Sequence, residues 1–134
     1  MLKYTVVVLV LAIVSEQCMA QNLILAYNSC SSEFNVDMEA FNALKNGDFS
    51  NRTPLIECFG DCIVKKAGFM REDLSFNKDT IVKFVARFIK PADAGTVYEK
   101  CTSNVTPTLC VTAYDVYQCI YENTYSKWGT RINW

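Results

Sequence analysis

The sequence predicts an all-α fold, a compact domain of six helices held together by disulfide bonds. Apolar residues recur at helical spacing along residues 22–125, and no segment shows the convincing period-two alternation of a strand. The chain of 134 residues contains seven cysteines, and six of them follow an N-terminal targeting segment. An even number of cysteines in a short secreted chain indicates a disulfide framework.

Residues 1–20 have the features of a secretory signal peptide. Lys3 supplies the positive charge of the N-terminal region, and Val6 to Val14 is an uninterrupted apolar run. Small residues close to and at Ala20 suit a cleavage site after that residue. A run of roughly 10 apolar residues is too short to cross the ~30 Å hydrocarbon core of a membrane. We therefore expect a signal peptide at 1–20 and one helical domain at 21–134. Secretion into extracellular fluid follows from this prediction.

The first two helices are expected at residues 22–30 and 36–45. In the second, Val36, Ala40, Phe41 and Leu44 recur at helical spacing, and Asn46-Gly47 is a stop signal. The third helix is expected to start at Thr53-Pro54, because threonine is a good N-cap and proline suits the first helical position. Gly68 ends it.

This third helix carries Cys58 and Cys62 between an apolar and a polar side. The apolar side consists of Ile56, Phe59, Ile63 and Ala67, and the polar side of Glu57, Asp61 and Lys65. We expect the polar side to be solvated and stabilised by an ion pair between Asp61 and Lys65, which are four residues apart.

The remaining three helices are expected at 80–89, 92–102 and 107–125. Asn77 or Asp79 caps the first of them, Pro91 closes it, and its apolar face consists of Ile81, Val82, Phe84, Val85, Phe88 and Ile89. Thr106-Pro107 repeats the Thr-Pro start and opens the last helix. Aromatic side chains at 3- and 4-residue intervals form an arc along that helix: Tyr114, Tyr117, Tyr121, Tyr125 and Trp128.

Helix geometry narrows the disulfide pairing without fixing it. Cys58 and Cys62, on consecutive turns, are too far apart to bond to each other. Cys110 and Cys119 are half a turn out of phase on the predicted last helix, with Cys110 in the aromatic arc. Excluding these two pairs leaves 10 of the 15 pairings that six cysteines allow.

The cysteine order Cys30-x27-Cys58-x3-Cys62-x38-Cys101-x8-Cys110-x8-Cys119 resembles the insect odorant-binding protein family, of the six-cysteine pheromone and general odorant-binding type. The x3 and the last x8 spacings are its most specific elements, and the pattern covers nearly all of residues 21–134. The resemblance implies bridges Cys30–Cys62, Cys58–Cys110 and Cys101–Cys119. It also implies a hydrophobic cavity between the helices, which carries small lipophilic molecules without a cofactor and without covalent chemistry.

Given this resemblance, we expect apolar and aromatic side chains of three helices and the C-terminal segment to line the cavity. They are Phe59, Ile63, Ile81, Phe84, Val85, Phe88, Tyr114, Tyr117, Tyr121 and Trp128. Ordinary core packing is the alternative role for these residues. The set suits a neutral chain- or ring-bearing ligand whose oxygen bonds to a tyrosine hydroxyl. Residues 128–134 could then fold back as a lid.

Composition excludes most other functions. The chain has no histidine, which removes His-dependent catalysis and His-based metal sites, and bridged cysteines leave no thiolate. We therefore expect no enzyme and no metal site. The net charge is −1, and loss of Lys3 and Glu16 with the signal peptide leaves it unchanged. Without a basic run, nucleic acid is not an expected partner.

Two glycosylation sequons begin at Asn51 and Asn104, but Thr53 and Thr106 are more plausible as helix caps. The protein partner could be a chemosensory receptor or another secreted protein, and the chain a monomer or weak dimer. The fluid could be sensillar lymph, haemolymph or seminal fluid. The alternative function is a secreted interaction protein of haemolymph or seminal fluid that acts through protein–protein contacts.

Overall fold

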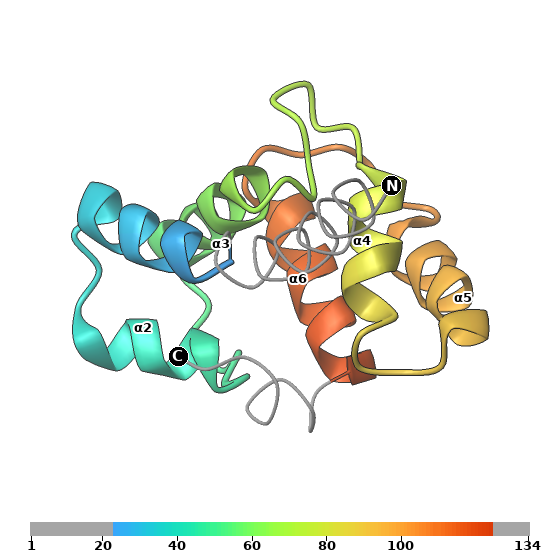
Figure 1. Cartoon of the computed structure of the whole chain (residues 1–134). Helices are drawn as coiled ribbons and strands as arrows, with labels where there is room; N and C mark the ends of the chain where they lie inside the picture. Colours follow the sequence, from blue (N-terminus) through green and yellow to red (C-terminus); the bar gives the residue numbers. More distant parts are fainter. Residues whose placement is uncertain (1–22, 125–134) are drawn as a thin grey trace, which may run out of the picture.

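The computed structural model describes residues 23–124, which form six helices and no strand, so the all-α prediction is confirmed for this range. The first helix covers residues 23–34. It is followed by α2 (Met38–Lys45), α3 (Pro54–Lys66), α4 (Lys78–Val85), α5 (Pro91–Thr102) and α6 (Val111–Thr124) (Figure 1). The only extended pairing among the described residues is one antiparallel bridge, between Met70 and Phe76, in the α3–α4 connection. The predicted signal peptide, Tyr125, Trp128 and the predicted lid lie outside the described residues.

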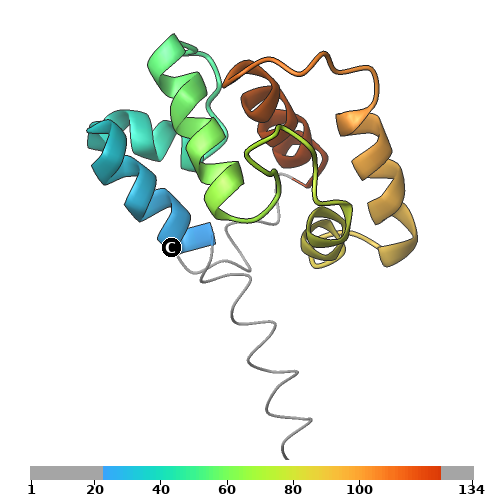
Figure 2. The ribbon, with the colours of Figure 1, turned by 90° about the horizontal axis from the view of Figure 1, so that it is seen from above.

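The helix α6 occupies the centre of the domain. Seen from above, the first helix, α2 and α3 lie on one side of α6, and α4 and α5 lie on the other (Figure 2). The helix α3 packs directly against α6, and α5 packs against both α4 and α6. Within the described range, no helix is long and apolar enough to cross a membrane.

Three helices start at the capping residues that side-chain chemistry favours. The Thr53 hydroxyl accepts a hydrogen bond from Ile56 N at 3.2 Å, with Pro54 at the first helical position, as predicted. Asn77, one of the two predicted caps, accepts from Thr80 N at 3.4 Å. Asp37 caps α2 by accepting from Ala40 N at 2.7 Å.

Two predicted helix ends differ from the structure. The first helix continues to residue 34, four residues past the predicted end at Cys30. The helix α4 ends at Val85 instead of residue 89, because the backbone tightens into i→i−3 hydrogen bonds. Arg87 N donates to Phe84 O at 3.2 Å, and Phe88 N donates to Val85 O at 3.0 Å.

The start of the last helix was predicted wrongly. Helix α6 begins at Val111, and Cys110 just before it has a left-handed backbone with φ of 68°. Thr106 is not its cap: the Thr112 hydroxyl donates to Thr106 O and accepts from Thr108 N. This local network holds residues 106–110 in a loop. Cys110 therefore precedes α6, and the prediction that Cys110 and Cys119 lie on one helix was wrong.

The three disulfide bonds have the pairing that the family resemblance implied. Cys30–Cys62 joins the first helix to α3, Cys58–Cys110 joins α3 to the start of α6, and Cys101–Cys119 joins α5 to α6. Their Cα–Cα distances are 5.9, 4.5 and 5.5 Å, within the range of ordinary disulfides. Four of the six described helices are thus cross-linked through α3 and α6.

Candidate ligand-binding site

The structure gathers nearly all predicted lining residues into one hydrophobic core. Eight of them are buried, each at most 3% exposed, and Tyr121 is half-buried against the same core. Trp128 lies outside the described residues. The predicted set therefore converges in space, while its contact with a ligand stays a prediction.

The rings of this core that surround α6 form what we call the tyrosine group. Its members are Tyr27, Phe41, Phe49, Phe59, Tyr114, Tyr117 and Tyr121. Phe49 has a central position, because its ring centroid lies 5.7–6.0 Å from those of Tyr114, Tyr117 and Tyr121. These contacts are edge-to-face, the geometry that aromatic pairs favour. The group brings together side chains from the first helix, α2, the 46–53 loop, α3 and α6.

A glycine makes room for one of these rings. Gly47 has φ of 80°, and a Cβ there would come within 2.2 Å of Tyr121 Cε1. The Asn46-Gly47 stop signal of the sequence is thus also the position where the loop passes directly against the ring of Tyr121.

Two tyrosine hydroxyls meet inside the tyrosine group. The hydroxyls of Tyr27 and Tyr117 hydrogen-bond to each other, and Tyr117 also donates to Leu44 O at 3.3 Å. Burial raises the pKa of Tyr117 well above its usual value of 10.0, because the phenolate would lose its hydration. Burial also raises the pKa of Tyr121. These side chains are therefore neutral hydroxyls across the physiological range.

The hydroxyl of Tyr114 is buried and makes no hydrogen bond within the described part of the chain. Its ring lies against α3, where a Cβ on Gly60 would approach Tyr114 Cδ2 to 3.1 Å. The Arg52 guanidinium also packs over this ring, 4.6 Å from its centroid. Burial raises the pKa of Tyr114, and the charge of Arg52 partly opposes this shift. An unsatisfied buried hydroxyl is costly, so it is a natural partner for a polar atom of a ligand or for water.

Arg52 also links three parts of the chain at the edge of the tyrosine group. Its guanidinium lies 2.9 Å from a carboxylate oxygen of Glu57 on α3 and 2.6 Å from one of Asp115 on α6. The side chains of Arg52, Glu57 and Asp115 are 34%, 16% and 49% exposed, so Glu57 is shielded from solvent and Asp115 is not. Together with the nearby Cys58–Cys110 bridge, this cluster fixes the N-terminal ends of α3 and α6 to each other.

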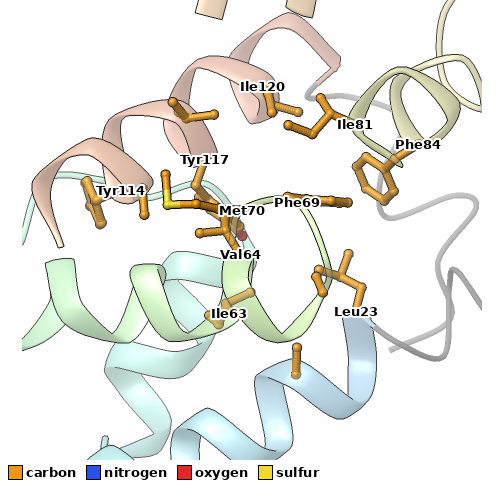
Figure 3. Packing of buried hydrophobic residues seen from close by; sticks show 14 of the residues in the cluster. Leu23, Ile63, Val64, Phe69, Met70, Ile81, Phe84, Tyr114, Tyr117 and Ile120 are labelled. Carbon is orange, nitrogen blue, oxygen red and sulfur yellow. The ribbon is translucent and has the colours of Figure 1, made fainter. Parts of the chain in front are cut away.

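A second set of rings, the phenylalanine group, consists of Phe69, Phe84 and Phe88. Phe84 lies 5.0 Å from Phe69 and 5.1 Å from Phe88, measured between ring centroids. Figure 3 shows Phe84 beside Phe69, and Leu23 of the first helix lies below these two rings in the same view. Ile81 of α4 and Ile120 of α6 point toward one another in the same view.

Val64 and Met70 lie between the two aromatic groups (Figure 3). Both are buried, at 2% and 4% exposure. Methionine adapts its shape easily, because its side chain is unbranched and has three rotatable bonds. Met70 can therefore change its shape more easily than the rings on either side of it.

Sequence reasoning missed four rings of the two groups: Tyr27, Phe41, Phe49 and Phe69. A signal for Tyr27 was present, because Leu23, Tyr27 and Cys30 recur at helical spacing and all are buried. Phe41 lies with Leu44 on the apolar face predicted for the second helix, but it was not assigned to the site. Phe49 lies in a loop, where no periodicity marks a buried side chain.

The polar side of α3 also differs from the prediction. The Asp61–Lys65 ion pair is present, at 2.8 Å, but it is not solvated: the two side chains are only 10% and 13% exposed. The first helix and the α3–α4 connection cover this face, since Glu33, Phe34 and Glu72 share a pocket with Asp61.

The core presents apolar side chains and neutral hydroxyls, and the disulfide bonds keep the surrounding helices in place. Among the described residues, no group of three or more acidic, cysteine or histidine side chains is arranged to hold a metal ion. The fold and this core define a class of small, disulfide-bridged helical binding proteins.

The sequence matches the PBP/GOBP family over residues 14–123, and the chain belongs to this family. The resemblance seen in the cysteine spacing is thereby confirmed. The structure is similar to that of a fatty acid binding protein, OBP56a, from the oral disk of the blowfly Phormia regina. The TM-score is 0.62 at 20% sequence identity, over 78% of this chain and 90% of that one. At this identity the likeness shows the fold alone. No curated protein sequence matches the chain.

Proposed function

We propose that the protein is a secreted carrier that binds small hydrophobic molecules between its helices and transports them through extracellular fluid. It performs no covalent chemistry. The signal peptide at residues 1–20 would direct secretion, and residues 21–134 would form the carrier. The ligand would be a neutral, long or ring-bearing molecule such as an odorant or pheromone.

The observation that carries this proposal is that the tyrosine group and the phenylalanine group converge in one hydrophobic core, in a member of the PBP/GOBP family. We place the ligand between the tyrosine group and the phenylalanine group, beside Val64 and Met70. Its lining would include Phe59, Ile63, Ile81, Phe84, Val85, Phe88, Tyr114, Tyr117 and Tyr121, with Trp128 as a further contact. The hydroxyl of Tyr114 or Tyr117 would bond to an alcohol, ester or ketone oxygen.

A neutral ligand is favoured because the cations of the described core are already engaged. Arg52 bridges Glu57 and Asp115, and Lys65, whose side chain is only 13% exposed, pairs with Asp61. The blowfly protein is described as binding fatty acids, which supports a lipophilic ligand but leaves its head group open. Comparing a long-chain alcohol with the acid of equal length therefore tests this part of the proposal.

Displacement of a lipophilic fluorescent dye from the purified, disulfide-bonded protein tests the function. We expect hexadecanol to displace the dye at lower concentration than palmitate. Phe84→Ala should weaken hexadecanol binding by about 1–3 kcal/mol, because it removes apolar contact area. Leu109→Ala, at a side chain that is 65% exposed, is the matched control and should bind like the wild type. Unchanged affinity in a folded Phe84→Ala protein would contradict this lining.

The alternative, a secreted interaction protein, would use exposed apolar side chains. Leu25, Met38, Leu55 and Leu109 are each at least 51% exposed, but they come from four different segments. A protein of this kind would bind neither dye nor alcohol and would co-purify with a protein partner. The dye experiment therefore separates the two functions.

A further inference from the structure

The outer face of α3 contains a polar pocket on the side away from α6. It has a volume of about 190 Å³ and is lined by Glu33 and Phe34 of the first helix, Asp61, Cys62, Lys65 and Lys66 of α3, and Glu72 of the following connection. Apart from the bridged Cys62, the proposed carrier function does not use any of these side chains. The pocket therefore needs a separate account.

Asp61 is the unusual member of the pocket. The residue is 7% exposed, and although its Oδ2 lies 2.8 Å from Lys65 Nζ, its Oδ1 is buried and accepts no hydrogen bond within the described part of the chain. A buried carboxylate oxygen without a donor costs free energy that a bound donor would recover. A donor would reach Oδ1 by displacing side chains at the mouth of the pocket, where Lys66 and Glu72 are 40% and 91% exposed.

The charges of the pocket favour a cation over an anion. Both lysines already have carboxylate partners: Lys65 pairs with Asp61 and lies 3.8 Å from Glu72, and Lys66 pairs with Glu33 at 2.8 Å. Lys66 also donates to the Ser29 hydroxyl at 2.7 Å. Three carboxylates against two ammonium groups leave the lining with one excess negative charge. Phe34 adds an apolar wall on which the carbon skeleton of a ligand can pack.

We propose that this pocket is a second ligand site, which binds a small organic ammonium ion through Asp61. The ammonium group donates a hydrogen bond to Asp61 Oδ1, and the excess negative charge of the lining stabilises it. A short aryl or alkyl chain on the ligand packs against Phe34. The site is independent of the core between α3, α4 and α6, so an amine and a lipophilic ligand can be bound at once.

Calorimetric titration of the disulfide-bonded protein with 2-phenylethylammonium chloride at pH 7 and low salt tests this proposal. We expect saturable binding, and at least 10-fold weaker binding of 2-phenylethanol, which has a similar shape but no charge. Asp61→Asn should weaken amine binding at least 10-fold. Asp93→Asn, the same change at an exposed site on α5, should leave it unchanged.

Two further measurements on the wild-type protein keep the test decisive even if Asp61→Asn does not fold. In the NMR spectrum, the amine should shift the backbone amides of Phe34, Asp61 and Lys65. In the dye assay, it should leave the dye bound in the core undisturbed. Absence of binding, equal binding of the alcohol, shifts confined to α4 and α6, or displacement of the core dye would each overturn the proposal.

Discussion

Tyr27 and Tyr117, which are 90 positions apart in the sequence, share a hydrogen bond between their hydroxyls inside the hydrophobic core. Both residues are at most 2% exposed. The bond joins the first helix to α6, whereas the Cys30–Cys62 bridge joins the first helix only to α3. The tyrosine pair therefore completes a triangle of connections between these three helices. It also places two neutral hydroxyls inside the tyrosine group, beside the proposed ligand position.

Tyr117→Phe should lower the free energy of unfolding by about 1–2 kcal/mol, because it leaves the buried hydroxyl of Tyr27 without this partner. The double variant Tyr27→Phe with Tyr117→Phe should lose less than the sum of the two single changes, since the hydrogen bond that the two hydroxyls share is lost only once. Urea unfolding monitored by circular dichroism measures both effects. Tyr98→Phe, at a half-buried tyrosine of α5, is the control, and we expect a change below about 0.5 kcal/mol. Strictly additive losses would show that the two hydroxyls do not interact.

The protein should lose stability in alkaline solution. Burial raises the folded-state pKa of Tyr117 well above 10.0, so the folded state holds the phenolic proton more tightly than the unfolded state does. This contribution is fully present below the unfolded pKa of about 10 and is lost as the pH rises through the folded pKa. Urea midpoints at increasing alkaline pH should therefore fall less steeply for Tyr117→Phe than for the wild type. Parallel curves for the two proteins would argue against a buried, proton-linked Tyr117.

The three disulfide bonds should differ in their contribution to stability. Cys58–Cys110 spans 52 residues and Cys101–Cys119 spans 18. In the chain-entropy account, replacing both cysteines of Cys58–Cys110 by alanine should lower the free energy of unfolding by about 1 kcal/mol more than the same change at Cys101–Cys119. The longer bridge also holds α3 against the start of α6, so its loss should weaken dye binding more. An equal effect of both double variants on binding would contradict the role given to Cys58–Cys110.

Ligand release should not depend on mild acidification. The chain has no histidine, and the charged cluster at the edge of the tyrosine group is Arg52 with Glu57 and Asp115. Histidine is the side chain that ordinarily changes its charge between about pH 5 and 8, so the chain lacks the usual group for a switch in this range. We expect nearly constant affinity from about pH 7.5 to about 5.5 and loss only in stronger acid. Dye titrations across this range measure it, and a steep loss near about pH 6 would reveal a switch outside this account.

Local chemistry in the sequence predicts much of this fold, because caps and turns act over a few residues. Thr53, Asn77, Gly47 and Gly68 stand where the helices start or stop. The start of α6 could not be predicted in this way. Thr106-Pro107 looks like a helix start, but the Thr112 side chain and the bridge of Cys110 to Cys58 hold that segment in a loop. A tertiary constraint prevails there over the local signal.

The site shows the same division between local and long-range information. The periodicity of α3, α4 and α6 identifies their buried faces, and the aromatic residues on those faces do converge. Phe49 and the burial of Asp61 depend on which segment covers which face, and helical periodicity carries no such information. Asp61 is covered by the first helix and by the α3–α4 connection. Neither segment belongs to α3, so the periodicity of α3 cannot reveal this burial.

The most direct test of ligand binding between the helices is methyl NMR of the disulfide-bonded protein with isotope-labelled isoleucine and a saturating long-chain alcohol. Ile63 and Ile81 are fully buried beside the proposed ligand position, whereas Ile24 and Ile89 are half-buried. Our account predicts intermolecular nuclear Overhauser effects from the alcohol chain to the methyl groups of Ile63 and Ile81. Contacts confined to Ile24 and Ile89, or none at saturation, would contradict it.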